Sequence, residues 1–150
     1  SLEIIEEQRI YPDLVIHLEE TFPFRPEGLF DGMIRNLLKF GHDSVIAARG
    51  ESSFIWQENH DGGFNRIDSG DVPREFKEKI LVGLHGLGCI SHPEFIRTGK
   101  FLGPNIGLFE VDDNIASFEV RDSVSLEKAQ KAVNERFKII TIQIISSQHP

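Results

Sequence analysis

The chain has 150 residues, enough for one domain with a sizeable core, and its composition is that of a globular protein: 39% hydrophobic and 27% charged. Its net charge of −8 argues against broad nucleic-acid binding, because there is no surplus of cations to displace phosphate counterions. The single cysteine, Cys89, excludes an internal disulfide framework and fits a reducing compartment. We therefore expect a cytoplasmic protein with no membrane span and no leader peptide.

The first third of the chain predicts a strand, a helix and a second strand after a weakly helical segment at 2–10. The apolar run 14–18 is bounded by turn signals, which is typical of a strand buried on both faces. Pro26 suits the first turn of a helix, apolar residues follow at helical spacing, and Gly41 ends that helix. With a strand at 44–48, this order predicts a parallel pair joined by a right-handed crossover.

A polar junction follows the first of these strands, with the sequence Glu-Glu-Thr-Phe-Pro-Phe-Arg at 19–25. Ligands bind just beyond the carboxyl ends of strands in open α/β sheets, so we expect a site here. Glu19 and Glu20 are neighbours and point to opposite faces, so at most one of them lines a given pocket. Arg25 could grip a carboxylate or phosphate through its bidentate fork, or it could pair with Glu20 or Glu27 and only fix the turn.

The middle of the chain predicts an excursion over 54–79 that begins with a β-hairpin at 54–67. A polar, glycine-bearing tip separates the two short strands of this hairpin. If the hairpin projects from the sheet, then Phe54, Trp56 and Phe64 need cover from another chain, and a homodimer contact is one interpretation. The other interpretation is that these aromatic side chains pack on the domain's own core.

The second half predicts a strand over 80–91, where several glycines indicate bulges or close approach by another group. A short helix could start at His92, and a further strand is expected at 106–111. Ser125 is a good N-cap for a final helix, and the tail at 138–145 favours a strand.

A zinc site is one interpretation of His85, Cys89 and His92, but the spacing argues against it. His85 and Cys89 would share a strand face, His92 would fall on the other, and a fourth ligand with convincing spacing is lacking. His85 is better interpreted as a pocket or core histidine that can both donate and accept a hydrogen bond when neutral.

Four segments in order resemble motifs of the acylneuraminate, or CMP-sialic acid synthetase-like, cytidylyltransferases. Residues 14–25 resemble that family's Leu-Gln-x-Thr-x-Pro-Leu-Arg element, and residues 43–48 resemble its aspartate-serine-valine strand. Residues 82–90 resemble its asparagine-glycine-alanine strand, and residues 119–121 resemble its Ile-Asp-Ile-Asp segment. The resemblance extends over roughly residues 11–135.

This resemblance implies an α/β fold: a three-layer αβα Rossmann-like nucleotidyltransferase fold of the GT-A type, with a mostly parallel sheet between helices and a β-hairpin excursion, in a single domain that is incomplete at the N-terminus. The implied reaction is attack of an acidic sugar's hydroxyl on the α-phosphorus of CTP, with pyrophosphate leaving, catalysed by positioning, Mg²⁺ and basic side chains. The family's glycine-rich nucleotide-binding loop has no counterpart in this chain. The chain would then supply mainly the sugar side and be inactive alone. The alternative is a degenerate, non-catalytic binding or dimerisation module.

The resemblance also assigns residues to the sugar pocket, namely Glu19, Thr21, Arg25, His85, Gly86 and Cys89. Glu19 stands where the family has glutamine, and His85 stands where it has asparagine. Glu119 falls at the first aspartate of the last motif, and Arg121 falls at the second, which ordinarily helps to hold Mg²⁺. A guanidinium has only donors and cannot ligate a cation. The implied Mg²⁺ site is therefore damaged, or an acid from elsewhere completes it. That family commonly dimerises through an excursion like the one at 54–79.

Overall fold

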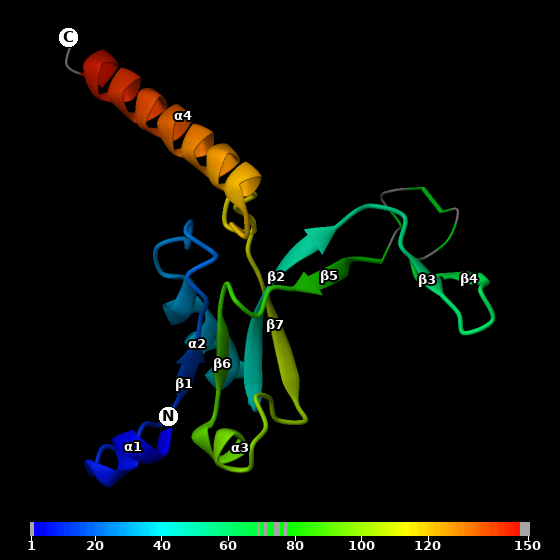
Figure 1. Cartoon of the computed structure of the whole chain (residues 1–150), viewed down its shortest axis with the longest axis vertical. Helices are drawn as coiled ribbons and strands as arrows, with labels where there is room; N and C mark the ends of the chain where they lie inside the picture. Colours follow the sequence, from blue (N-terminus) through cyan, green and yellow to red (C-terminus); the bar gives the residue numbers. More distant parts are fainter. Residues whose placement is uncertain (1, 69, 71, 74–75, 77, 148–150) are drawn as a thin grey trace.

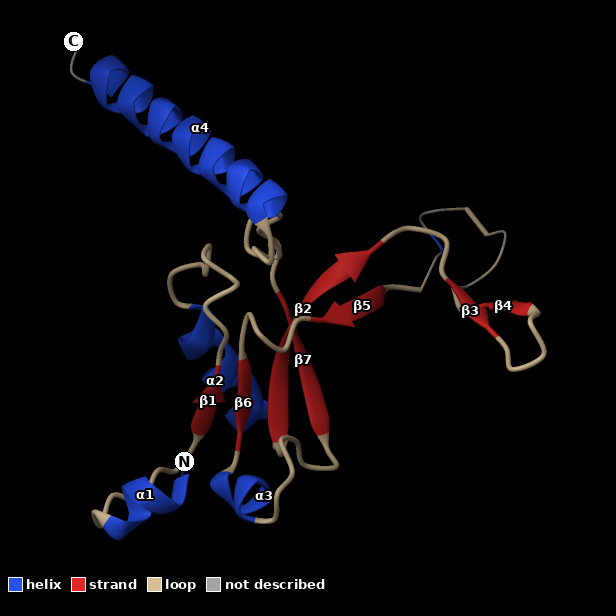
Figure 2. Cartoon of the chain, in the orientation of Figure 1, coloured by secondary structure: helices blue, strands red, loops and turns tan. Residues whose placement is uncertain are grey.

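The computed structural model describes the backbone of residues 2–68, 70, 72–73, 76 and 78–147, and the side chains of those up to residue 135. Figures 1 and 2 show the arrangement of the elements. In chain order they are α1 (Leu2–Glu7), β1 (Val15–His17), α2 (Leu29–Phe40), β2 (Ser44–Glu51), β3 (Trp56–Glu58), β4 (Phe64–Arg66), β5 (Ile80–Gly83), β6 (Cys89–Ser91), α3 (Pro93–Arg97), β7 (Ile106–Glu110) and α4 (Ser123–Ser147).

Strand β2 is the centre of a mixed five-stranded sheet. β6 and then β5 pair antiparallel with one edge of β2, and β7 pairs parallel with its other edge. β1 pairs antiparallel with β6, so β1 and β2 run in the same direction with β6 between them. The expected direction is confirmed, but β1 and β2 are not neighbours. The prediction of a mostly parallel sheet was wrong, since three of the four pairings in this described sheet are antiparallel.

Helix α2 covers one face of the sheet and forms most of the core. Its buried residues Leu29, Met33 and Leu37 are spaced four apart and therefore lie on one side of the helix. They pack with Val45 and Ala47 of β2, whose side chains share one face of the sheet. Full burial of residues 44–48 follows from pairing along both edges of β2 and from this helix cover.

The ends of α2 show where local sequence decides the structure. Gly41 has a φ of 64° and closes the helix in the left-handed conformation, as expected, with its N–H donating to the carbonyl of Leu37. The expected start in the turn of Pro26 is wrong. Gly28 has a φ of 72°, which is outside the helical region, so the regular helix begins at Leu29.

Strand β1 is shorter and less buried than expected. The prediction of a strand buried on both faces was wrong, because β1 is at the sheet edge and Ile16 is 38% exposed.

The strand prediction for 138–145 was also wrong: this segment continues α4. A strand needs a paired neighbour for its backbone groups, whereas a helix pairs them internally. At the start of α4, Asp122 rather than Ser125 acts as the cap, since its carboxylate accepts from the N–H of Ser125 at 2.7 Å.

The described elements form two layers, α2 and the sheet. α1 and α3 lie together at one end of the sheet, and α4 projects from the opposite end (Figure 2). A helix on the second face, which a three-layer arrangement requires, is not among the described elements. The described helices also include none that is long and apolar enough to cross a membrane.

The predicted hairpin is confirmed as β3 and β4, at the end of an arm that β2 and β5 begin (Figure 1). The arm projects from the sheet, so its aromatic side chains do not pack on the domain's own core. Phe54, Trp56 and Phe64 are 65%, 56% and 64% exposed. The guanidinium of Arg66 lies 4.6 Å from the ring centre of Phe54 and 5.9 Å from that of Trp56.

The helix–sheet contact predicts that alanine substitutions at two adjacent leucines change the free energy of unfolding by very different amounts. Leu37 is 1% exposed, while Leu38 is 67% exposed on the same helix. Leu37→Ala should lower the free energy of unfolding by about 3 kcal/mol, because it leaves a cavity against β2. Leu38→Ala is the control and should change it by less than about 0.5 kcal/mol. Urea unfolding measures both, and equal effects would contradict this packing.

Candidate functional site

The side chain of Arg25 ties the predicted junction to the turn before β6. Its Nε donates to the carbonyl of Leu87 at 3.0 Å, and Nη1 donates to the carbonyl of Phe22 at 2.8 Å. Nη2 donates to the carbonyl of Gly86 at 2.9 Å and also to that of Glu19. The guanidinium thus joins two segments about sixty residues apart. Arg25 therefore fixes the turn, which was one of the two interpretations of this residue from the sequence. It does so by binding main-chain carbonyls and not by pairing with Glu20 or Glu27.

Glu19 lies directly against this clamp and extends the pairing of β1 with β6. Its backbone N–H donates to the carbonyl of Gly86 at 2.8 Å. The carboxylate Oε2 accepts from the hydroxyl of Thr21 at 3.3 Å, and Oε1 lies 3.9 Å from Nε2 of His17. The Glu19 side chain is 42% exposed, so its carboxylate is accessible to a ligand.

Gly86 is required by the closeness of this contact. A Cβ at this position would lie 2.7 Å from a ring carbon of Phe22 and 2.8 Å from the carboxyl carbon of Glu19. Both distances are shorter than real Cβ contacts, so only glycine lets the two turns meet. The expected single strand over 80–91 was wrong, because a turn at 85–87 separates β5 from β6, but the expectation that a glycine here marks a close approach holds at Gly86.

The segment at 119–121 also contacts the turn at 19–21. The backbone N–H of Val120 donates to the carbonyl of Thr21 at 2.8 Å. Glu119 and Arg121 form an ion pair with 2.5 Å between Oε1 and Nη2. Hydrogen bonding and attraction to Glu119 raise the pKa of Arg121 above its ordinary value. Three of the four resembling segments thus converge on the Glu19–Thr21 turn.

These residues do not form a ready Mg²⁺ site. Glu119 directs Oε1 at Arg121, so the guanidinium occupies the side where a cation would bind. Among the described residues, no group of three or more histidine, cysteine, aspartate or glutamate side chains is placed to hold a metal ion. The Mg²⁺ ion stays a prediction from the resemblance.

His85 and Cys89 have different positions relative to this convergence. His85 is half-buried in the same turn as Gly86. Cys89 is buried on β6, where burial raises the pKa of its thiol to about 11. It lines a separate cavity of ~140 Å³ together with His17 and Phe101. The structure therefore brings Glu19, Thr21, Arg25 and Gly86 into direct contact, and His85 precedes Gly86 in its turn, while Cys89 is buried and has no described contact with this group.

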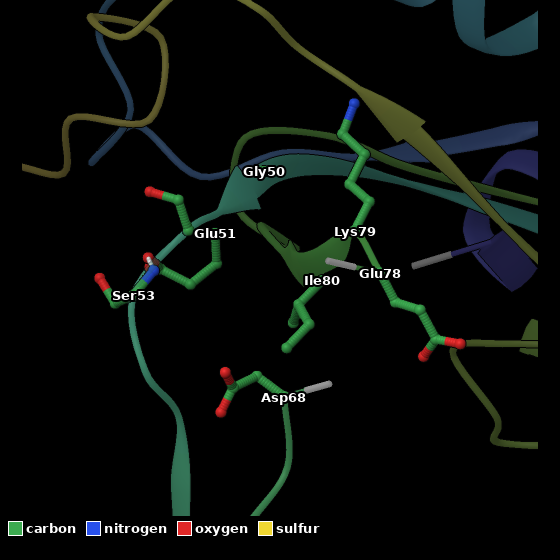
Figure 3. Close-up of a pocket in the computed structure, with 8 residues that line it drawn as sticks. Gly50, Glu51, Ser53, Asp68, Glu78, Lys79 and Ile80 are labelled. Atoms are coloured by element: carbon green, nitrogen blue, oxygen red, sulfur yellow. Dashed lines mark hydrogen bonds between the residues drawn. The ribbon is translucent and has the colours of Figure 1, made fainter. Parts of the chain in front are cut away.

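Sequence reasoning missed two features. His17 was not considered, although strand alternation places it on the face of Glu19 and would have shown it. A cavity of ~360 Å³ at the base of the arm was also missed, since separate segments line it. Figure 3 shows Ile80 and Asp68 directed into this cavity beside Glu51. Hydrogen bonds from Ser53, and to a lesser degree the guanidinium of Arg49, lower the pKa of Glu51 to about 2.

Comparison with known proteins supports the fold. No protein-family model matches the chain, and no curated protein matches it. Among solved structures, it is similar to the crystal structure of 4-diphosphocytidyl-2C-methyl-D-erythritol synthase from Anaerococcus prevotii, with a TM-score of 0.56 and 12% sequence identity. The match covers 88% of this chain and 64% of that chain, so this chain spans less than two thirds of that enzyme. At this identity the likeness shows the α/β fold alone.

The close contact at Gly86 predicts that two glycines only a few residues apart respond differently to the same change. Gly86→Ala should lower the melting temperature by several degrees, since Phe22 and Glu19 must move apart. Gly83→Ala is the control, because a Cβ there would meet only a methyl of Ile46 at an ordinary 3.6 Å. Calorimetry on both variants tests the contact, and a tolerated Gly86→Ala would show that the turns do not meet.

Proposed function

We propose that this chain is the acceptor-binding part of a nucleotidyltransferase that joins a nucleotide to a sugar hydroxyl. On the resemblance, the nucleotide donor is CTP, the acceptor is an acidic sugar, and the protein is a cytoplasmic one that binds no nucleic acid. The observation that carries the proposal is the convergence of the Glu19–Arg25 turn, the Gly86 turn and the 119–121 segment. These are three of the four segments that resemble the cytidylyltransferase motifs. The fold similarity to a diphosphocytidyl-compound synthase supports the same class of enzyme.

The chemistry of the convergence suits binding and orientation of a polyhydroxylated acceptor. The carboxylate of Glu19 accepts hydrogen bonds from hydroxyl groups, and the hydroxyl of Thr21 can both accept and donate. His85 adds a ring that can do either from the neighbouring turn. Arg25 holds these groups in place by binding the main chain that carries them. Positioning of this kind is the larger part of catalysis in phosphoryl-group chemistry.

The second candidate function is a non-catalytic binding or dimerisation module of the same fold. The ion pair between Glu119 and Arg121 favours it, because that pair occupies the position at which the resemblance expects a cation. The exposed aromatic side chains of the arm favour it as well. Under this hypothesis the acceptor still binds, but no nucleotide is transferred.

The enzyme proposal predicts release of pyrophosphate from CTP when a sugar is supplied. The assay is run on the 150-residue chain and on any longer natural product of the same gene, since the nucleotide side is not evident in this sequence. Thr21→Val should reduce turnover about ten-fold by removing one acceptor contact. Thr98→Val is the control, because its exposed hydroxyl lies at the end of α3 and donates only to the carbonyl of Phe95. No pyrophosphate release in any form of the protein would exclude the enzyme and favour the binding module.

The exposed arm predicts a homodimer in either case. Phe54 and Trp56 should lose their exposure at the contact, so Trp56→Ser should shift the protein toward the monomer. Light scattering after size exclusion measures the mass. Leu38→Ser is the control, because it removes an equally exposed apolar side chain from α2 instead. A wild-type monomer at high micromolar concentration would contradict the dimer.

A further inference from the structure

We propose that the acceptor is uncharged or cationic where it meets Glu19, presenting a hydroxyl or amino group there rather than a carboxylate or phosphate. This inference rests on the proposed function and narrows its substrate class. It departs from the acidic sugar that the motif resemblance implies. The argument depends on which charged groups of the convergence can still contact a ligand.

The accessible charged group at the turn is an acceptor. Glu19 takes the place of a neutral glutamine in the resembling motif, and its side chain is 42% exposed. An ionised carboxylate offers only acceptor oxygens, so it binds hydroxyl and amino groups and repels other anions. Its near neighbour Thr21 already donates to it at 3.3 Å, and the carboxylate keeps further acceptor positions for an incoming ligand.

Arg25 is the residue of this motif that a ligand carboxylate would need, and its donors are already used. Four of its five N–H groups point at main-chain carbonyls, on Nε, Nη1 and Nη2. A bidentate grip on a carboxylate requires two adjacent N–H groups. To form one, Arg25 would have to release the carbonyls that join the turns at Glu19 and Gly86.

Arg121 is the second guanidinium near the turn, and it too is engaged. Its Nη2 lies 2.5 Å from the carboxylate of Glu119, and Glu19 also attracts it. A ligand anion would have to compete with two carboxylates of the chain for this one cation. His17 lies 3.9 Å from Glu19 and adds a half-exposed ring. The Arg121 side chain is 69% exposed, so an anionic ligand can reach it, but only in competition with these carboxylates.

A matched pair of ligands tests this inference directly. N-Acetylneuraminic acid and its methyl ester differ at a single group, which is an ionised carboxylate in the acid and an uncharged ester with one additional methyl group in the other. Binding is followed by the amide NMR shifts of Thr21 and Gly86 in the full chain, without nucleotide. We expect the ester to bind at least about ten-fold more tightly than the acid at low salt, the size expected for a like charge near a partly exposed carboxylate.

Two variants separate a local effect from the overall negative charge. Glu19→Gln should abolish the preference for the ester by removing the facing charge. Glu20→Gln makes the same change in net charge on the exposed neighbour that points to the opposite face, and it should keep the preference. Equal or tighter binding of the acid overturns the inference, as does a preference that survives Glu19→Gln or failure of both ligands to bind at tens of millimolar. Pyrophosphate release is measured separately. A preference for the ester without pyrophosphate release would exclude the nucleotidyltransferase but support the proposed charge of the bound ligand.

Discussion

The contact on which the site depends is the guanidinium of Arg25 among the carbonyls of Glu19, Phe22, Gly86 and Leu87. The carbonyls of Glu19 and Gly86 also accept from the N–H groups of Phe22 and Glu19, whereas the described residues supply no other donor to the carbonyls of Phe22 and Leu87. Loss of the guanidinium would therefore leave these two partly buried acceptors unpaired, and each costs about 1–3 kcal/mol in such a position. Arginine suits this role because its planar fork can donate in several directions at once, which lysine cannot do.

The same contact explains why β1 belongs to the sheet although it is only three residues long. A short edge strand contributes few hydrogen bonds, but the backbone N–H of Glu19 extends the pairing to Gly86 and Arg25 then fixes both turns. Gly86 permits this by lacking a Cβ. Sheet pairing, the glycine and the arginine therefore depend on one another, and the carboxylate of Glu19 is held at an exposed position as a result.

Function follows from charge as much as from fold. The fold is similar to that of a solved synthase at 12% sequence identity, and many chemistries share one fold. What distinguishes this chain is that both arginines of the convergence are already engaged, Arg25 with carbonyls and Arg121 with Glu119, while Glu19 stays accessible. A site arranged in this way would disfavour anions under the inference proposed above, and the net charge of −8 acts in the same direction.

The sequence alone determined the elements whose signals are local. Helical spacing found the buried face of α2, Gly41 marked its end, and a polar tip between apolar runs located the hairpin of β3 and β4. Strand ends and the motif resemblance also placed Glu19, Thr21 and Gly86 at one site. Such features depend on residues close together in the chain, where sterics and hydrogen bonding act without knowledge of the rest of the fold.

Tertiary structure decided the features that depend on partners far apart in the chain. Three features are of this kind: the position of β6 between β1 and β2, the helical state of 138–145, and the pairing of Glu119 with Arg121. The use of Arg25 is the clearest case: its sequence neighbours offered Glu20 and Glu27, but the fold brought the carbonyls of Gly86 and Leu87 within reach. A long cationic side chain binds whatever oxygen atoms the completed packing places around it, and spacing along the chain does not specify them.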